Sequence, residues 1–183
     1  MNPLSTLHEH EEDCYPRFII GSLVRPCTKR LRAAMVLRRM KPLSCHLDIG
    51  CADGYLLSKS PCREKIGLDK ILGSPVDKKL EFKNAYFDYI TLLAVVEHLD
   101  HPRETLAECA RILKSQGQLI MTTPLQKAEK WIRFYIHGIE KEHKTYFDLE
   151  KMKDFLHPFF KVVHYQKFLF GMNQLFVCEK APE

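Results

Sequence analysis

A run of acidic and small residues from Asp48 to Gly54 has the composition of a ligand-binding turn. Small residues at positions 50, 52 and 54 permit a tight turn and a close approach of the backbone to a ligand. Dinucleotide-binding fingerprints place their last glycine one residue further along. A carboxylate at Asp48 would repel a pyrophosphate, whereas it suits a cationic group. The run therefore predicts a site for a ligand that carries positive charge, although an ordinary strand–turn–helix has a similar pattern.

A second acidic residue, Asp69, lies fifteen residues after Gly54 and ends the short apolar stretch 65–69. An acidic side chain at the end of the second strand of a nucleotide-binding sheet hydrogen-bonds ribose hydroxyls. A helix N-cap or a turn is the structural alternative for such a residue. We therefore interpret Asp69 as a candidate ribose ligand.

Alternating apolar and helical patterns indicate the elements that must position these residues. Strands are expected at 44–50, 65–69, 86–93, 118–123, 162–170 and 174–179, the last two joined by a hairpin-like turn. Helices are expected at 26–40, 55–60, 103–113, 126–139 and 148–156, and the breakers Pro3, Pro16 and Gly21 predict an irregular segment over 1–24. This order predicts an α/β fold, with a Rossmann-like, mostly parallel sheet, helices on both faces and a C-terminal antiparallel strand pair. Ligands of such sheets bind at the carboxyl ends of the strands.

The stretch from Leu47 to Pro124 resembles the class I S-adenosylmethionine-dependent methyltransferases of the compact, type 11-like kind. The segment LDIGCADGYL resembles their glycine-rich first motif, and IGLD resembles their ribose-binding strand end. The segment FDYITLLAVVEHLDHPRETLAECARILKSQGQLIMTTP resembles their fourth and fifth strands with the helix between them. The resemblance covers about 80 residues in several ordered motifs.

The resemblance implies S-adenosylmethionine as the cofactor. In that family pattern Asp48 faces the ammonium group, Asp69 holds the ribose diol and Asp77 lies near the adenine. Leu93 and Ala94, at the end of the fourth strand, pass beside the methionine portion. The cofactor-binding residues that the resemblance implies are Asp48, Gly50, Cys51, Ala52, Gly54, Asp69, Asp77, Leu93 and Ala94.

The sequence departs from the family pattern at two places. Ala52 replaces the middle glycine, and alanine fits there if the backbone avoids positive φ. Only seven residues separate Asp69 from Asp77, so the usual helix between the second and third strands is expected to be missing. One flank of the adenine pocket would then be thin.

Methyl transfer from a sulfonium is an in-line displacement, so the protein must supply approach geometry and, for a weakly acidic acceptor, a base. Histidine has the right unperturbed pKa to accept a proton near neutrality. The candidates for that base are His98, after the fourth strand, and His143, in a segment expected to border the acceptor pocket. Each has a structural alternative, such as orienting its own loop, so the sequence assigns no definite catalytic residue.

Composition excludes several other classes of protein. With 183 residues, 45% of them hydrophobic and 28% charged, the chain fits one soluble domain, and it has no apolar run near the roughly 20 residues that cross a bilayer. Acidic residues precede any apolar stretch, which is the wrong order for a secretory signal, so a cytoplasmic location is expected. The seven cysteines and nine histidines lack metal-ligand spacing, so we expect no metal.

The net charge of +5 is concentrated in a predicted basic helix over 25–41, which is either a solvated face or a surface for an anionic partner. We divide the domain into an N-terminal extension, 1–43, which includes this helix, and a methyltransferase domain, 44–183. The expected function is methylation of a small or medium-sized acceptor, namely a metabolite, lipid or glycan. The alternatives are a non-catalytic S-adenosylmethionine-binding regulatory module and a nucleic-acid methyltransferase.

Overall fold

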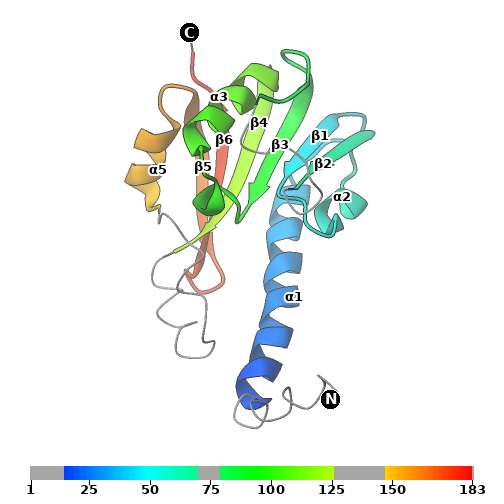
Figure 1. Ribbon diagram of the computed structural model, residues 1–183, viewed down its shortest axis with the longest axis vertical. Coiled ribbons are helices and arrows are strands. Elements are labelled where there is room, and N and C mark those ends of the chain that lie inside the picture. Colours follow the sequence, from blue (N-terminus) through cyan, green and yellow to red (C-terminus); the bar gives the residue numbers. More distant parts are fainter. Residues whose placement is uncertain (1–14, 70–78, 126–146, 183) are drawn as a thin grey trace, which may run out of the picture.

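A six-stranded mixed sheet forms the centre of the computed structural model, which describes residues 15–69, 79–125 and 147–182 (Figure 1). In spatial order the strands are β2 (Glu64–Leu68), β1 (Cys45–Ile49), β3 (Phe87–Leu93), β4 (Leu113–Pro124), β6 (Asn173–Lys180) and β5 (Phe160–Phe168). The first four of these run parallel, whereas β6 is antiparallel to β4 and to β5. This topology confirms the predicted α/β sheet with a C-terminal antiparallel pair.

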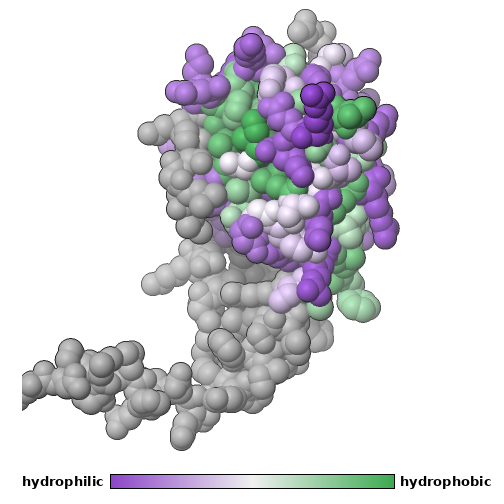
Figure 2. Space-filling view, turned by 90° about the vertical axis from the view of Figure 1, so that its right-hand side faces the viewer, coloured by the Kyte–Doolittle hydropathy of each residue, from purple (hydrophilic) through white to green (hydrophobic). Residues whose placement is uncertain are grey.

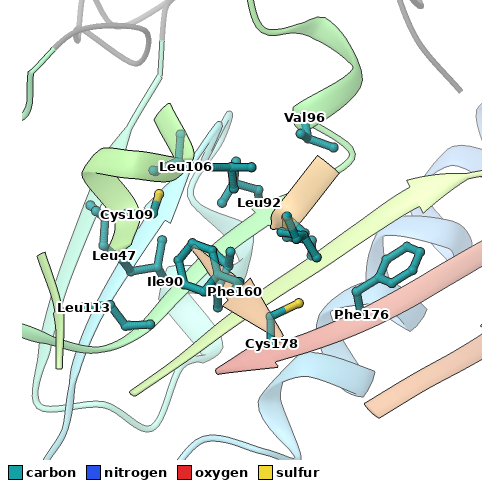
Figure 3. Close-up of a cluster of buried hydrophobic side chains, with 14 of the residues drawn as sticks. Leu47, Ile90, Leu92, Val96, Leu106, Cys109, Leu113, Phe160, Phe176 and Cys178 are labelled. Carbon is teal, nitrogen blue, oxygen red and sulfur yellow. The ribbon is translucent and has the colours of Figure 1, made fainter. Parts of the chain in front are cut away.

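Side-chain alternation along the strands gives the sheet two buried faces. On one face, Leu47 and Ile90 pack with side chains of α3 (Pro102–Ile112) and α5 (Leu149–Leu156). Figure 3 shows Leu106 and Cys109 of α3 directed toward these strand residues. Because both faces of the central strands are buried, these strands appear in the sequence as continuous apolar runs.

The opposite face of the sheet is covered by α1 (Tyr15–Leu37) and by the short α2 (Tyr55–Lys59). Val36 of α1 is fully buried there, in the same cluster as Tyr89 of β3 and Val177 of β6. The C-terminal part of α1 therefore belongs to the same core as the sheet. On the side of the molecule seen in Figure 2, hydrophilic side chains surround and separate the apolar ones.

The first helix corrects two predictions. It begins at Tyr15 rather than at position 26, so it includes Pro16 and has Pro26 in its interior. Pro16 lies in the first turn, where a missing N–H breaks no helical hydrogen bond, so it does not act as a breaker. The helix ends at Leu37, so the basic residues from 38 to 41 follow the helix instead of extending it. In Figure 1 the N-terminal half of α1 extends beyond the sheet.

The other boundaries lie within a few residues of their predictions, with one exception. The strand expected at 118–123 begins at Leu113, directly after α3. Between β2 and β3, residues 79–86 contain no helix, and residues 70–78 lie outside the described residues, as does the helix expected at 126–139. None of the helices in the described ranges is long and apolar enough to cross a membrane.

Candidate functional site

The turn between β1 and α2 has a backbone that only some residues can adopt. Gly50 and Gly54 have φ angles of +77° and +72°, in the left-handed region that favours glycine. At Gly50 an added Cβ would also lie 2.2 Å from Cγ2 of Val95, whereas at Gly54 it would meet nothing within 4 Å. Gly50 is therefore required by both space and conformation, and Gly54 by conformation alone.

The condition under which alanine fits at position 52, a backbone that avoids positive φ, is not met, because the φ of Ala52 is +45°. A side chain in this region costs about 1 kcal/mol. The conformation is held by a hydrogen bond in which the Ala52 N–H donates to Oδ2 of Asp69 at 2.8 Å. The replacement of glycine by alanine thus leaves the turn in place at the cost of local strain.

Asp69 follows the end of β2 and is buried, with 8% of its surface exposed. Its carboxylate accepts the Ala52 N–H, while the N–H groups of Gly50 and Cys51 donate to the carbonyl of Leu68 at 2.7 and 3.2 Å. These contacts attach the turn to β2. Asp69 is not among the described lining residues of the pocket beside this turn, so its ribose role stays a prediction.

Asp48 is the buried acid of the site, with 3% of its surface exposed. The hydroxyl of Thr91, on the neighbouring strand β3, donates to its Oδ1 at 2.6 Å. Burial raises the pKa of Asp48 to about 7, because removal from water disfavours the charged form. The hydrogen bond from Thr91 acts in the opposite direction, and the negative charge of Asp69 adds to the rise. The carboxyl group is thus poised between its two charge states near neutral pH.

Next to this acid is a pocket of about 200 Å³ at the carboxyl edge of the parallel strands. Its lining comes from the C-terminal half of α1, from the end of β1, from the β1–α2 turn, from α2 and from the end of β3. The lining residues are Lys29, Arg32, Ala33, Asp48, Gly50, Cys51, Ala52, Asp53, Tyr55, Leu56 and Leu93. Five of the predicted cofactor residues, namely Asp48, Gly50, Cys51, Ala52 and Leu93, are therefore brought together around one pocket, whereas Gly54 is not among its described lining residues.

Two cations of α1 complete the wall opposite the turn. Arg32 donates to Oδ1 of Asn173, on β6, from Nη2 at 2.6 Å and from Nε at 3.2 Å. Burial lowers the pKa of Arg32, whereas the charge of Glu97 raises it. Lys29 pairs with Asp53 and lies 4.8 Å from the centroid of the Tyr55 ring. These contacts attach α1 to the β1–α2 turn through Lys29 and to strand β6 through Arg32.

The segment after β3 only partly matches its prediction. Leu93 lines the pocket, but Ala94 does not; instead Ala94 has a φ of +60° and its N–H donates to the carbonyl of Thr122 at 2.8 Å. His98 ends the short 3₁₀ turn Val96–His98 and is not among the described lining residues. Its catalytic role therefore stays a prediction. Asp77 and His143 lie outside the described residues.

Lys29 and Arg32 line the pocket, but the sequence did not predict that these two residues would do so. The basic segment 25–41 contains both, but its charge pattern does not distinguish them from cations that face solvent, such as Arg30. It also missed Thr91 and His46, which are buried polar residues in otherwise apolar strands. A polar side chain at an inward strand position was the available signal, since buried polar groups require partners.

A second and larger cavity, of about 660 Å³, lies at the opposite edge of the sheet, near the amino ends of β1 and β3. Arg39, Lys41 and Lys114 contribute cations to its lining, and Lys114 pairs with Asp88 at 2.9 Å. Its size does not make it the active-site candidate, because ligands of such sheets bind at the carboxyl ends of the strands. The anionic partner predicted for segment 25–41 stays a prediction. No group of three or more metal-ligating side chains occurs in the ranges that the structure describes.

Comparison with known proteins agrees with this geometry. A family model described as a methyltransferase domain matches residues 23–164. Two curated relatives are ubiquinone biosynthesis O-methyltransferases, one from Dechloromonas aromatica, 25% identical over 116 residues, and one from Nitrosococcus oceani, 29% identical over 117 residues. Each match covers 51% of this chain, and 50% and 49% of the two relatives, so the chain matches about half the length of these proteins.

Solved structures with the same fold include an S-adenosylmethionine-dependent methyltransferase from Clostridium acetobutylicum, with a TM-score of 0.66 and 12% identity over 93% of this chain and all of that one. A possible histamine N-methyltransferase from Thermotoga maritima has a TM-score of 0.65 and 16% identity, over 91% of this chain and 98% of that one. At these identities the likeness concerns the fold. Because the family model covers most of the sequence, including the turn and the four parallel strands of the sheet, the chain belongs to the methyltransferase-domain family.

Proposed function

We propose that the chain binds S-adenosylmethionine in the pocket beside Asp48 and transfers its methyl group to a small-molecule acceptor. The observation that carries this proposal is the charge arrangement of the pocket. A buried carboxylate, Asp48, lies on the sheet side, and the guanidinium of Arg32 lies on the helix side. The methionine portion of the cofactor has an ammonium and a carboxylate group, and these two walls are complementary to them.

The residues of the turn fit this cofactor better than a dinucleotide. Without a side chain at Gly50, the backbone of the turn is accessible to a ligand in the pocket, and Asp48 disfavours a phosphate group at that place. The ring of Tyr55 adds an aromatic side chain to the wall, with the ammonium group of Lys29 over the ring. Asp69 supports the turn from behind through Ala52.

When bound, the cofactor supplies an electrophilic methyl group on a sulfonium, so the protein need not activate it. The tasks of the chain are to hold the amino-acid portion between Asp48 and Arg32 and to keep the turn rigid. The helix α1, which Arg32 links to Asn173, closes the pocket on one side and limits access of water. The described lining residues include no histidine, so a base for the acceptor would come from elsewhere.

The acceptor class rests on the curated relatives. Both are named for ubiquinone biosynthesis, which favours O-methylation of a phenolic or quinone-like metabolite here. Since the chain matches about half of their length, a lipid or glycan acceptor is the second option within this proposal.

Calorimetric titration with S-adenosylmethionine and with S-adenosylhomocysteine tests cofactor binding. We expect both to bind, and we expect ATP, a matched control with an adenosine but an anionic tail, not to compete. Transfer of a labelled methyl group to a panel of catechols and hydroxylated quinols then tests turnover. An absence of binding at millimolar cofactor would contradict the whole proposal. Binding without transfer to phenols, lipids or glycans would instead favour the regulatory module.

A further inference from the structure

A line of four buried polar side chains connects the cofactor pocket to the C-terminal end of α2. It runs from Asp48 through Thr91 and His46 to Ser60, the residue that follows α2 as its C-cap. The exposed fraction is 3% for Asp48, 0% for Thr91 and His46, and 7% for Ser60. Such a network inside an otherwise apolar layer is costly unless every member is satisfied.

The register of the sheet brings these residues together. Asp48 pairs with Thr91 across β1 and β3, and His46 lies two positions before Asp48, so all three side chains point to the face covered by α1 and α2. Nε2 of His46 lies 2.8 Å from Oγ1 of Thr91, and Nδ1 lies 3.2 Å from Oγ of Ser60. Both ring nitrogens therefore have a partner.

The direction of each hydrogen bond follows from the number of protons available. An ionised Asp48 can only accept, so the single hydroxyl proton of Thr91 must point at Oδ1, 2.6 Å away. Thr91 must then accept at its oxygen, and His46 is the donor through Nε2–H. A neutral imidazole with its proton on Nε2 accepts at Nδ1, so the single hydroxyl proton of Ser60 points at His46, 3.2 Å away, rather than at the weaker acceptor Sδ of Met40, 3.6 Å away.

A neutral ring is the form that this environment favours. Burial, together with a smaller contribution from the charge of Lys65, lowers the pKa of His46 to about 4. The ring therefore keeps one proton across the neutral pH range, and its position is dictated by the neighbours. The backbone N–H of Cys62 donates to Oγ of Ser60 at 3.4 Å and so extends the same direction of donation.

We propose that His46 is a positioning residue of the cofactor site, which holds the hydroxyl of Thr91 on the carboxylate of Asp48. Every donor in the line points toward Asp48, so the network stabilises its ionised form, and hydrogen bonds to a charged group are stronger than those between neutral groups. Neither His46 nor Thr91 lines the pocket. Their effect on a cationic ligand is thus indirect, and this part of the inference rests on the proposed function.

The tautomer of His46 in the protein without ligand is the first test. Long-range proton–nitrogen correlation spectra of protein labelled at histidine distinguish Nε2–H from Nδ1–H. We expect Nε2–H between pH 7.5 and 8.5, where Asp48 is ionised. An Nδ1–H tautomer, or a charged ring, would overturn the proposal whether or not the chain binds S-adenosylmethionine.

Two substitutions of His46 form a matched pair for the second test. His46→Leu fills similar space without hydrogen bonds, whereas His46→Gln can donate an amide N–H to Thr91 and accept from Ser60. We expect about tenfold weaker binding of S-adenosylhomocysteine in His46→Leu, because the hydroxyl of Thr91 is then no longer held on the charged Asp48, and recovery of most of that loss in His46→Gln. Equal affinity in the wild type and in a folded His46→Leu would overturn the proposal.

Thr91→Val covers the case in which His46→Leu does not fold. It keeps the shape of Thr91 and removes the donor, so the pKa of Asp48, followed by carbon-13 NMR of its carboxyl group, is expected to rise above the wild-type value. An unchanged pKa would overturn the proposed role of the line. If the wild type binds neither S-adenosylmethionine nor S-adenosylhomocysteine, the proposed function fails, while the tautomer and this pKa still decide whether the line exists.

Discussion

Replacement of Asp48 by asparagine is expected to stabilise the protein without ligand and to weaken its binding of S-adenosylmethionine. Asparagine resembles the protonated carboxyl group in size and keeps an oxygen that can accept the hydroxyl proton of Thr91, 2.6 Å away in the wild type. It removes the charge that burial penalises. The substitution therefore separates what this residue does for folding from what we propose it does for the ligand.

The magnitude follows from the pKa of Asp48, which is raised from 3.8 to about 7 in the folded protein. Between these values the folded protein holds a proton that the unfolded chain has lost, so a rise in pH favours unfolding. The contribution of this group to stability is complete below the unfolded pKa and is lost as pH rises through the folded one. Each pKa unit is worth about 1.4 kcal/mol, so two units, from pH 5 to pH 7, correspond to about 3 kcal/mol.

Urea unfolding of the wild type and of Asp48→Asn at pH 5 and at pH 8 measures this term. Other titrating groups act on both proteins alike, so the difference between the two free energies of unfolding isolates Asp48. We expect the advantage of Asp48→Asn to grow by about 3 kcal/mol from pH 5 to pH 8. A difference that stays constant over this range would refute the reasoning. Calorimetry at pH 8 should show at least tenfold weaker cofactor binding by the variant, because a charge-assisted contact is lost.

Three further predictions concern the turn and the helix above it. Gly50→Ala should lower the free energy of unfolding in urea by several kcal/mol, because the added Cβ would lie 2.2 Å from a methyl group of Val95. Gly54→Ala should lower it by only about 1 kcal/mol, which is the cost of backbone strain alone. Equal losses in the two variants would contradict the packing argument. Ala52→Gly should leave the free energy of unfolding equal or raise it by up to about 1 kcal/mol, since relief of a φ of +45° opposes the added chain entropy. Arg32→Ala should weaken cofactor binding by calorimetry about tenfold or more, while the exposed control Arg30→Ala leaves it unchanged; similar affinities for both would remove Arg32 from the site.

Local signals in the sequence were sufficient for much of this molecule. The central strands were predictable because residues buried on both faces give short apolar runs, and the closing pair because a turn separates two such runs. The glycines at positions 50 and 54 were predictable because positive φ favours a residue without a side chain, and both have it. These features depend on residues within a few positions of one another, which is why the sequence alone determines them.

The start of α1 could not be predicted from breakers. Proline and glycine carry an intrinsic penalty within helices, yet α1 begins at Tyr15 and continues through Pro26. At its other end the helix buries Ala33 and Val36 against the sheet, and tertiary burial of this kind outweighs local preferences. Ala52 is a similar case, since its positive φ is held by the carboxylate of Asp69, which follows β2.

Only the tertiary structure determined which charged side chains line the pocket and which partners they have. Arg32 lies 141 positions before its partner Asn173, and Thr91 lies 43 positions after Asp48. The sequence marked Asp48 as an acid beside a glycine-rich turn, but the line through Thr91 and His46 depends on the pairing of β1 with β3. A shift of one residue in that register would turn the side chains of one strand to the opposite face and so break the line, and no local pattern specifies such a pairing.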